Sequence, residues 1–215
     1  FMNLANNIAD RLLQINAIKL NAPNPFTWAS GLRSPIYCDN RLILSYPAAR
    51  KELILALVRE SSSFDGINAI AGVATAGIAW GAYLADRLDL PYCYVRNKPK
   101  EHGMKNLIEG KLPENSTVLV IEDLISTGGS SLEAVHALQE NEIKVAGVLA
   151  IFQYGFLSAN EKFKENNIPF RTLTDFPTLL ERALYRNDIT SLEYDQLSSW
   201  NINPKLWSDQ FLNHN

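Results

Sequence analysis

The chain of 215 residues carries 20 lysines and arginines against 23 aspartates and glutamates, which gives a formal net charge of −3. This balance argues against a nucleic-acid-binding protein, because such proteins need surplus positive charge to displace counterions from phosphates. The hydrophobic fraction of 47% is ordinary for a globular domain, and no apolar run approaches the roughly 18 residues of a membrane span.

The length predicts a single domain over residues 1–215, with a core large enough to need no disulfide. The two cysteines, Cys38 and Cys93, are too few for a disulfide framework. The amino terminus lacks the basic and apolar regions of a secretory signal. We therefore expect a cytoplasmic protein that associates with neither membrane nor nucleic acid.

The first elements in chain order form an irregular amino-terminal region. An amphipathic helix is predicted over residues 4–18, because apolar residues recur every three or four positions. Short strands are expected over 26–28 and 35–39, around a turn at Ser30-Gly31. A helix then begins near Pro47 and runs toward residue 61.

From residue 67 onward, strands and helices alternate. Strands are predicted over 67–72, 92–95, 117–121, 145–152 and 170–173. Helices are predicted over 78–88, 131–140, 159–166, 178–186 and 192–200. The strands are apolar on both faces, so we predict an α/β fold with a parallel sheet flanked by helices. Ligands of such sheets lie at the carboxyl ends of the strands.

The most informative segment follows the predicted strand 117–121. Two adjacent carboxylates, Glu122 and Asp123, stand at the carboxyl end of this strand, and a Ser-Thr-Gly-Gly-Ser turn at 126–130 leads into a helix. Glycines let backbone amides converge on one point, and a helix N-terminus adds positive charge, so the turn suits a phosphate. The carboxylates suit ribose hydroxyls or hydrated Mg²⁺. The segment therefore indicates a site for a sugar phosphate.

This segment resembles the phosphoribosyl-pyrophosphate signature of the type I phosphoribosyltransferases, in which an apolar strand, an acid pair and a Thr-Gly-Gly turn follow one another. The resemblance implies the fold of that family, with a small hood formed mainly by residues 2–45. It implies Mg²⁺ as the cofactor, held mainly by pyrophosphate, with Asp123 as a contact through water. The residues implied to bind phosphoribosyl pyrophosphate here are Glu122, Asp123, Leu124, Ile125, Ser126, Thr127, Gly128, Gly129 and Ser130.

A long segment from Arg96 to Gly110 has no apolar periodicity and carries four basic and two acidic residues. Its length points to a lid or binding loop, although its charge alone is equally compatible with a solvated surface loop. The spacing of Arg96, Lys100 and His102 resembles the catalytic loop of one branch of the family, the orotate phosphoribosyltransferases. The resemblance implies that these three residues bind the pyrophosphate group, and that Lys100, His102 and Asp123 are catalytic.

The segment from Ser30 to Arg41 also resembles the orotate branch, whose hood carries a Ser-Gly…Ser-Pro-Tyr pattern. The resemblance implies that Tyr37 and Ser126 contact orotate. Arg33 or Arg41 can face an anionic base, and surface salt bridges remain the alternative for both arginines.

Several positions depart from the family pattern. Ala29, Ala76 and Asn97 stand where many relatives have basic residues. No arginine follows the strand over 145–152, where some relatives bind the orotate carboxylate, so we expect this contact to come from elsewhere. The small residues of the segment 72–77 still suit main-chain binding of pyrophosphate.

The resemblance implies a pentosyltransferase that moves the 5-phosphoribosyl group from phosphoribosyl pyrophosphate to orotate, giving orotidine 5′-monophosphate and pyrophosphate in de novo UMP synthesis. It also implies a homodimer with shared active sites. Two alternatives stay open: a related enzyme acting on a purine base, and a regulator of the same fold that only senses the ligand. The hood and the basic loop count against the first, and the acidic charge counts against the second.

Overall fold

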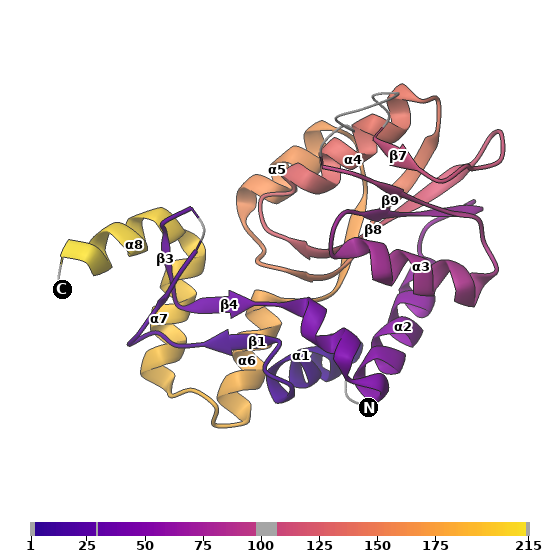
Figure 1. Ribbon diagram of the computed structural model, residues 1–215. Helices are drawn as coiled ribbons and strands as arrows, with labels where there is room; N and C mark the ends of the chain where they lie inside the picture. Colours follow the sequence, from indigo (N-terminus) through magenta and orange to yellow (C-terminus); the bar gives the residue numbers. More distant parts are fainter. Residues whose placement is uncertain (1–2, 29, 98–106, 214–215) are drawn as a thin grey trace.

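The computed structural model describes residues 3–28, 30–97 and 107–213. Its main sheet consists of β5 (Ala69–Val73), β6 (Tyr92–Val95), β7 (Ile108–Glu109), β8 (Thr117–Ile125), β9 (Lys144–Gln153) and β10 (Phe170–Asp175). The strand order is β10-β9-β8-β5-β6-β7, and every neighbouring pair is parallel except β6 with β7 (Figure 1). The α/β fold predicted from the sequence is confirmed.

Helices cover both faces of this sheet (Figure 1). One face packs against α1 (Leu4–Gln14), α2 (Pro47–Ser61) and α3 (Gly77–Leu88), and the other against α4 (Gly129–Glu140) and α5 (Leu157–Glu165). Successive residues of β8 alternate between the two faces. Leu119 and Ile121 are buried with the first set of helices, whereas Val118 and Val120 are buried with the second. This double burial explains why the strands are apolar throughout.

The hood contains two small antiparallel sheets. β1 (Ile18–Leu20) pairs with β4 (Ile36–Cys38), and β2 (Phe26–Thr27) pairs with β3 (Arg33–Ser34); the 3₁₀ helix η1 (Asn40–Ser45) follows. The strand predicted over 35–39 corresponds to β4, which starts one residue later and ends one residue earlier, whereas β3 was not predicted. Pro35 has no backbone N–H and separates β3 from β4, so the two short strands join different sheets.

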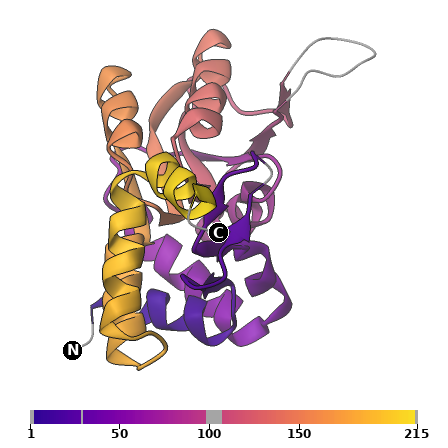
Figure 2. The same ribbon diagram turned by 90° about the vertical axis from the view of Figure 1, so that its left-hand side faces the viewer.

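Three helices at the carboxyl end lie beside the hood: α6 (Phe176–Tyr185), α7 (Ser191–Ile202) and α8 (Pro204–Asn213) (Figures 1 and 2). The backbone N–H of Arg33 in β3 donates to the buried Ser208 hydroxyl of α8 at 2.9 Å. The prediction did not include α8, which starts with Pro204 at a position where helices tolerate proline. No helix within the described ranges combines the length and apolarity that crossing a membrane requires.

An aromatic cluster fixes the hood to the carboxyl end of the sheet. The ring of Trp28 in the hood lies 5.5 Å from that of Tyr154, which follows β9, and 5.8 Å from that of Trp200 in α7. Phe176 of α6 packs on Trp200 at 5.3 Å. Aromatic pairs at these separations stabilise the contact beyond the area that they bury. The hood is thereby held beside the strand ends, where the predicted site residues lie.

Candidate active site

The acid pair lies within β8 rather than after it. β8 continues to Ile125 because β9 provides a pairing partner as far as Gln153, so the strand end predicted at residue 121 is wrong. β5 pairs with β8 only as far as Ile121. Past that residue no strand within the described ranges pairs with the β5 side of β8, and Glu122 and Asp123 line a cavity there.

This cavity, here called the strand-end cavity, has a volume of about 360 Å³. Residues from the hood, from the loop after β5, from β8 and from the start of α4 meet around it. Its lining residues are Cys38, Asp39, Arg41, Ala74, Thr75, Ala76, Asn97, Glu122, Asp123, Leu124 and Ser130. The structure therefore joins the acid pair to the loop after β5, as expected at the carboxyl end of a parallel sheet.

Glu122 is directed toward the start of α4 and is only 5% exposed. One of its carboxylate oxygens accepts a hydrogen bond from the backbone N–H of Asp123 at 3.0 Å. The other accepts from the hydroxyls of Ser130 and Ser131 at 3.3 and 3.4 Å. Burial, and next the negative charge of Asp123, raises the pKa of Glu122 well above its ordinary value. Such a perturbed carboxyl group beside a cavity is typical of functional sites.

Asp123 is half-buried and faces the hood. Burial raises the pKa of its carboxyl group, while the charge of Arg41 lowers it to a smaller extent. The side-chain amide of Asn40 donates to the backbone carbonyl of Asp123 at 2.8 Å, which ties η1 to β8. The two carboxylates thus have different surroundings, a difference that their adjacency in the sequence does not show.

Replacing Glu122 by glutamine is expected to raise the melting temperature at neutral pH. The pKa of Glu122 is raised in the folded chain above the ordinary 4.5, so the folded state holds this proton to higher pH than the unfolded state does. As pH rises past the ordinary value, the unfolded state loses this proton before the folded state does, so the free energy of unfolding falls. Glutamine does not titrate, so the variant lacks this loss of stability. The gain in melting temperature, measured from pH 4 to pH 8 without ligands, should therefore grow with pH. A gain that shrinks toward pH 8 would contradict a raised pKa of Glu122 in the folded chain.

The glycine turn after β8 has the backbone that the sequence predicted. Gly128 has φ = +76°, a conformation that favours glycine, and a Cβ there would lie 2.9 Å from the ring of Phe163. α4 starts at Gly129, and its first N–H groups have no acceptor within the helix. Together with the exposed hydroxyls of Thr127 and Ser130 they suit a phosphate. The side chain of Ile125 is buried, so only its backbone can contribute.

The glycines of the segment 72–77 serve packing rather than ligand approach. A Cβ on Gly72 would lie 2.6 Å from the Tyr92 hydroxyl, and one on Gly77 would overlap the carbonyl oxygen of Ile121. Residues 74–76, which lie between these glycines, line the strand-end cavity, and α3 starts directly after them. The groups of this loop that suit an anionic ligand are therefore its backbone N–H groups and the N-terminus of α3.

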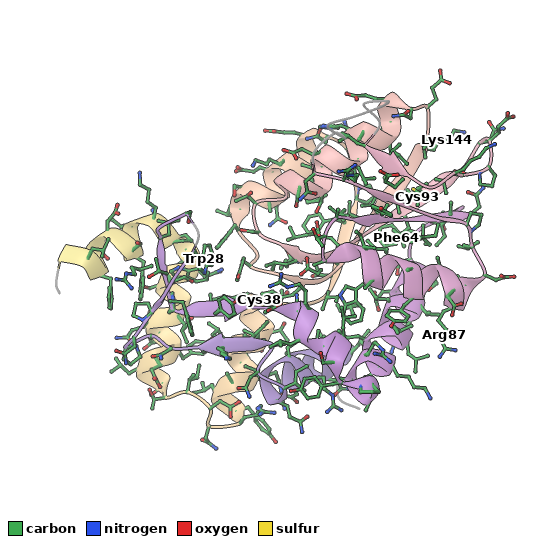
Figure 3. The ribbon with its side chains drawn as sticks, in the orientation of Figure 1. Trp28, Cys38, Phe64, Arg87, Cys93 and Lys144 are labelled. Carbon is green, nitrogen blue, oxygen red and sulfur yellow. The ribbon has the colours of Figure 1, made fainter. Side chains whose placement is uncertain are left out.

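A second cavity of about 310 Å³, here called the aromatic cavity, adjoins the first. It is lined by Thr27, Trp28, Tyr37, Cys38, Leu124, Ser126 and Tyr154. The two cavities share Cys38 and Leu124. Tyr37 and Ser126, the residues expected to contact the base, both line the aromatic cavity; Trp28 and Cys38 are labelled on the hood in Figure 3.

Sequence reasoning missed Trp28 and Tyr154 as lining residues. Trp28 was included only in a predicted strand, and the position after β9 was considered only for its lack of arginine. Each is a large aromatic residue at the carboxyl end of a predicted strand or within two residues of it, and this placement is the signal that could have identified them.

Neither hood arginine lines the aromatic cavity. Nε of Arg41 lies 2.7 Å from an Asp39 carboxylate oxygen, and this hydrogen bond lowers the pKa of Asp39. Arg41 lines the strand-end cavity instead, and its salt bridge agrees with the alternative that the sequence left open. Arg33 donates from its guanidinium to the Thr27 hydroxyl at 2.8 Å and lines neither cavity.

Arg96 stands at the end of β6, where its guanidinium lies 3.4 Å from a carboxylate oxygen of Glu109. It lines neither cavity, whereas its neighbour Asn97 lines the strand-end cavity. Lys100 and His102, the other residues predicted in this loop, lie outside the described residues. The structure therefore brings the acid pair, the glycine turn, Ser126 and Tyr37 together, and places Arg96 beside them.

The carboxylate oxygens of Glu122 and Asp123 suit a hard cation that takes its other ligands from water and from the substrate. Across the ranges that the structure describes, no three His, Cys, Asp or Glu residues gather as a metal centre. Glu122 and Asp123 nevertheless place carboxylates on the strand-end cavity. Mg²⁺ typically keeps several waters and binds through one or two carboxylates plus substrate phosphates, and this pair fits that mode.

Comparison with known proteins agrees with the geometry of the site. Residues 44–174 match the phosphoribosyl transferase domain family. The chain is 52% identical to an orotate phosphoribosyltransferase of Bacillus pumilus over 204 residues, covering 92% of this chain and 93% of the relative. It is 48% identical to the corresponding protein of Porphyromonas gingivalis over 201 residues, covering 93% and 96%. The solved orotate phosphoribosyltransferase of Aeropyrum pernix is similar with a TM-score of 0.74 and 28% identity, over 83% of this chain and 98% of that one. This chain therefore belongs to the phosphoribosyltransferase family, within its orotate phosphoribosyltransferase branch.

Proposed function

We propose that this chain transfers the 5-phosphoribosyl group from phosphoribosyl pyrophosphate to orotate, giving orotidine 5′-monophosphate and pyrophosphate in de novo UMP synthesis. The observation that carries the proposal is the junction of two cavities of opposite chemistry. One holds an acid pair and a glycine turn, and the other is lined by aromatic residues. A sugar phosphate fits the first and a flat base fits the second, with the reacting carbon between them.

The sugar phosphate is oriented by the segment 122–130. Glu122 and Asp123 accept hydrogen bonds from the ribose hydroxyls and stabilise positive charge on the sugar. The amides and hydroxyls of residues 126–130 hold the 5′-phosphate, because a helix N-terminus and free N–H groups favour an anion. Ser126, at the start of this turn, lines the cavity for the base.

In the reaction, N1 of orotate forms a bond to the anomeric carbon while the bond from that carbon to pyrophosphate breaks, and the proton of N1 passes to the departing pyrophosphate or to water. Negative charge grows on the leaving group, so catalysis is mainly electrostatic. Arg96, Lys100 and His102 supply positive charge to the pyrophosphate. Asp123 would hold Mg²⁺ through a water, and the ion would supply further neutralisation of that charge.

A substrate panel tests the proposed function. The protein is incubated with phosphoribosyl pyrophosphate, Mg²⁺ and one of orotate, uracil, adenine, guanine or hypoxanthine, and the nucleotide formed is identified by mass spectrometry. We expect orotidine 5′-monophosphate as the main product. Consumption of a purine but not of orotate would refute the proposal, and binding of phosphoribosyl pyrophosphate without turnover of any base would favour the regulator.

We also propose a two-fold homodimer in which each site combines Asp123 of one chain with Lys100 of the other. A loop with four basic residues on an acidic chain gains from reaching an anionic ligand on a neighbour. At a phosphoribosyl pyrophosphate concentration at which Asp123→Asn and Lys100→Ala are each nearly inactive alone, the two variants should then rescue one another. Free exchange of equal amounts makes half the dimers mixed, and one site of each mixed dimer carries neither substitution. By two-fold symmetry the pool should recover about a quarter of the wild-type activity.

The control for this experiment confirms mixed dimers with two different tags before activity is measured. Each variant mixed only with itself must stay inactive. A pool that contains mixed dimers but recovers no activity would show that each loop serves its own chain.

We propose that residues 1–215 act as one phosphoribosyltransferase domain, since the hood and the carboxyl-terminal helices both pack at the sheet that carries the site. We propose a cytoplasmic location, which agrees with the free thiols of Cys38 and Cys93.

A further inference from the structure

Tyr154 directly follows β9 and is held in one position by its surroundings. Its side chain is 3% exposed, and its ring lies 5.5 Å from that of Trp28 and 5.7 Å from that of Trp200. Its backbone carbonyl accepts a hydrogen bond from the side-chain amide of Asn201 at 2.7 Å. Because the ring is enclosed and the backbone is tied to α7, the position of the hydroxyl is set before any substrate binds.

The Tyr154 hydroxyl has no hydrogen-bond partner among the described residues. Tyr154 lines the aromatic cavity, and no residue in the ranges 3–28, 30–97 and 107–213 hydrogen-bonds its hydroxyl. Burial, followed by the charges of Cys38 and Asp123, raises the pKa of the hydroxyl well above its ordinary value, so the group stays a neutral donor at physiological pH. The hydroxyl is thus available to donate a hydrogen bond to a ligand that enters this cavity.

Tyr154 lines the aromatic cavity together with Cys38 and Leu124, the two residues that this cavity shares with the strand-end cavity. The charge of Asp123, which lines the strand-end cavity, contributes to the raised pKa of the Tyr154 hydroxyl, so the ring lies on the side of the aromatic cavity nearest this junction. In orotate, N1 is the atom that bonds to the ribose, and the carboxylate is carried by C6, the ring carbon next to N1. A base placed for reaction therefore brings its carboxylate to this junction.

The lining of the aromatic cavity leaves this task to a neutral donor. Its residues in the described part of the chain include no lysine, arginine or histidine, and Arg41, which lines the adjoining strand-end cavity, is paired with Asp39. We propose that the Tyr154 hydroxyl donates the hydrogen bond that holds the orotate carboxylate at the junction of the two cavities. The inference rests on the proposed function and names the carboxylate contact for which the sequence showed no arginine.

The test compares two nucleotides that differ only in this carboxylate, orotidine 5′-monophosphate and uridine 5′-monophosphate. Their dissociation constants are measured by calorimetry for the wild type and for Tyr154→Phe. Loss of a hydrogen bond to a charged group should raise the dissociation constant of orotidine 5′-monophosphate about 10- to 100-fold, and that of uridine 5′-monophosphate by less than about twofold. Tyr185→Phe, a matched change at an exposed residue of α6, should alter neither constant.

The melting temperature of the nucleotide-free protein gives a second readout. Phenylalanine keeps the ring and removes a hydroxyl that has no partner, so Tyr154→Phe should melt at the same temperature as the wild type or higher. A variant that unfolds would contradict the absence of a protein partner for the hydroxyl.

The inference is overturned if Tyr154→Phe weakens both nucleotides equally, or leaves the constant for orotidine 5′-monophosphate within about twofold. Either result, with a wild type that converts orotate, rejects the role of Tyr154 alone. A wild type that does not convert orotate rejects the proposed function itself.

Discussion

Replacing Lys100 by alanine should lower turnover about 10²- to 10³-fold, the usual loss when one charge contact to the transition state is removed. Negative charge grows on the departing pyrophosphate, so the contact is stronger in the transition state than in the bound substrate. The Michaelis constant for orotate should change far less, because the lysine acts on the other substrate. Steady-state kinetics with orotate varied at saturating phosphoribosyl pyrophosphate separates the two effects.

Lys105→Ala is the matched control, since it removes the same charge from the same loop at a position to which no role is assigned. Its turnover should stay within a few-fold of the wild type. An unchanged turnover in Lys100→Ala would contradict a catalytic role for this loop. Equal losses in both variants would indicate that only the total charge of the loop matters.

Replacing Asp123 by asparagine should weaken binding of phosphoribosyl pyrophosphate about 10- to 100-fold, which is the loss of a hydrogen bond to a charged group expressed as a dissociation constant. The fold should stay intact. Burial raises the pKa of Asp123 in the folded chain, so removing its charge relieves a desolvation cost at neutral pH. The melting temperature should therefore be unchanged or higher, while calorimetry shows the weaker binding.

Asp89→Asn provides the control for this variant. Asp89 is an exposed residue at the end of α3 with φ = +54°, a conformation that asparagine tolerates well. It should change neither the melting temperature nor the binding. If Asp123→Asn instead unfolds while the wild-type affinity is retained in its folded fraction, the acid pair is structural rather than ligand-binding.

The sheet could be predicted because its strands are apolar on both faces and alternate with amphipathic helices. The ends of these elements depend on neighbours that the sequence does not show. β8 runs to Ile125 only because β9 offers a partner as far as Gln153. In the hood, β1 has three residues, and its pairing with β4 depends on tertiary contacts rather than on a local pattern.

The same distinction applies to the site. The acid pair and the glycine turn are contiguous in the chain, so their residue types alone indicated a sugar phosphate. Trp28 and Cys38 belong to the hood, far from Tyr154 in the sequence, and these residues meet around one cavity only after folding. The hood arginines were expected near the base because of their charge, but Asp39 and Thr27 hold them elsewhere.

A crystal structure of this protein with orotidine 5′-monophosphate tests the central claim most directly. The account predicts the 5′-phosphate on the turn 126–130, the ribose hydroxyls on Glu122 and Asp123, and the base in the aromatic cavity with its carboxylate at Tyr154. A nucleotide bound with its phosphate away from the glycine turn, or with its base outside the aromatic cavity, would contradict the account.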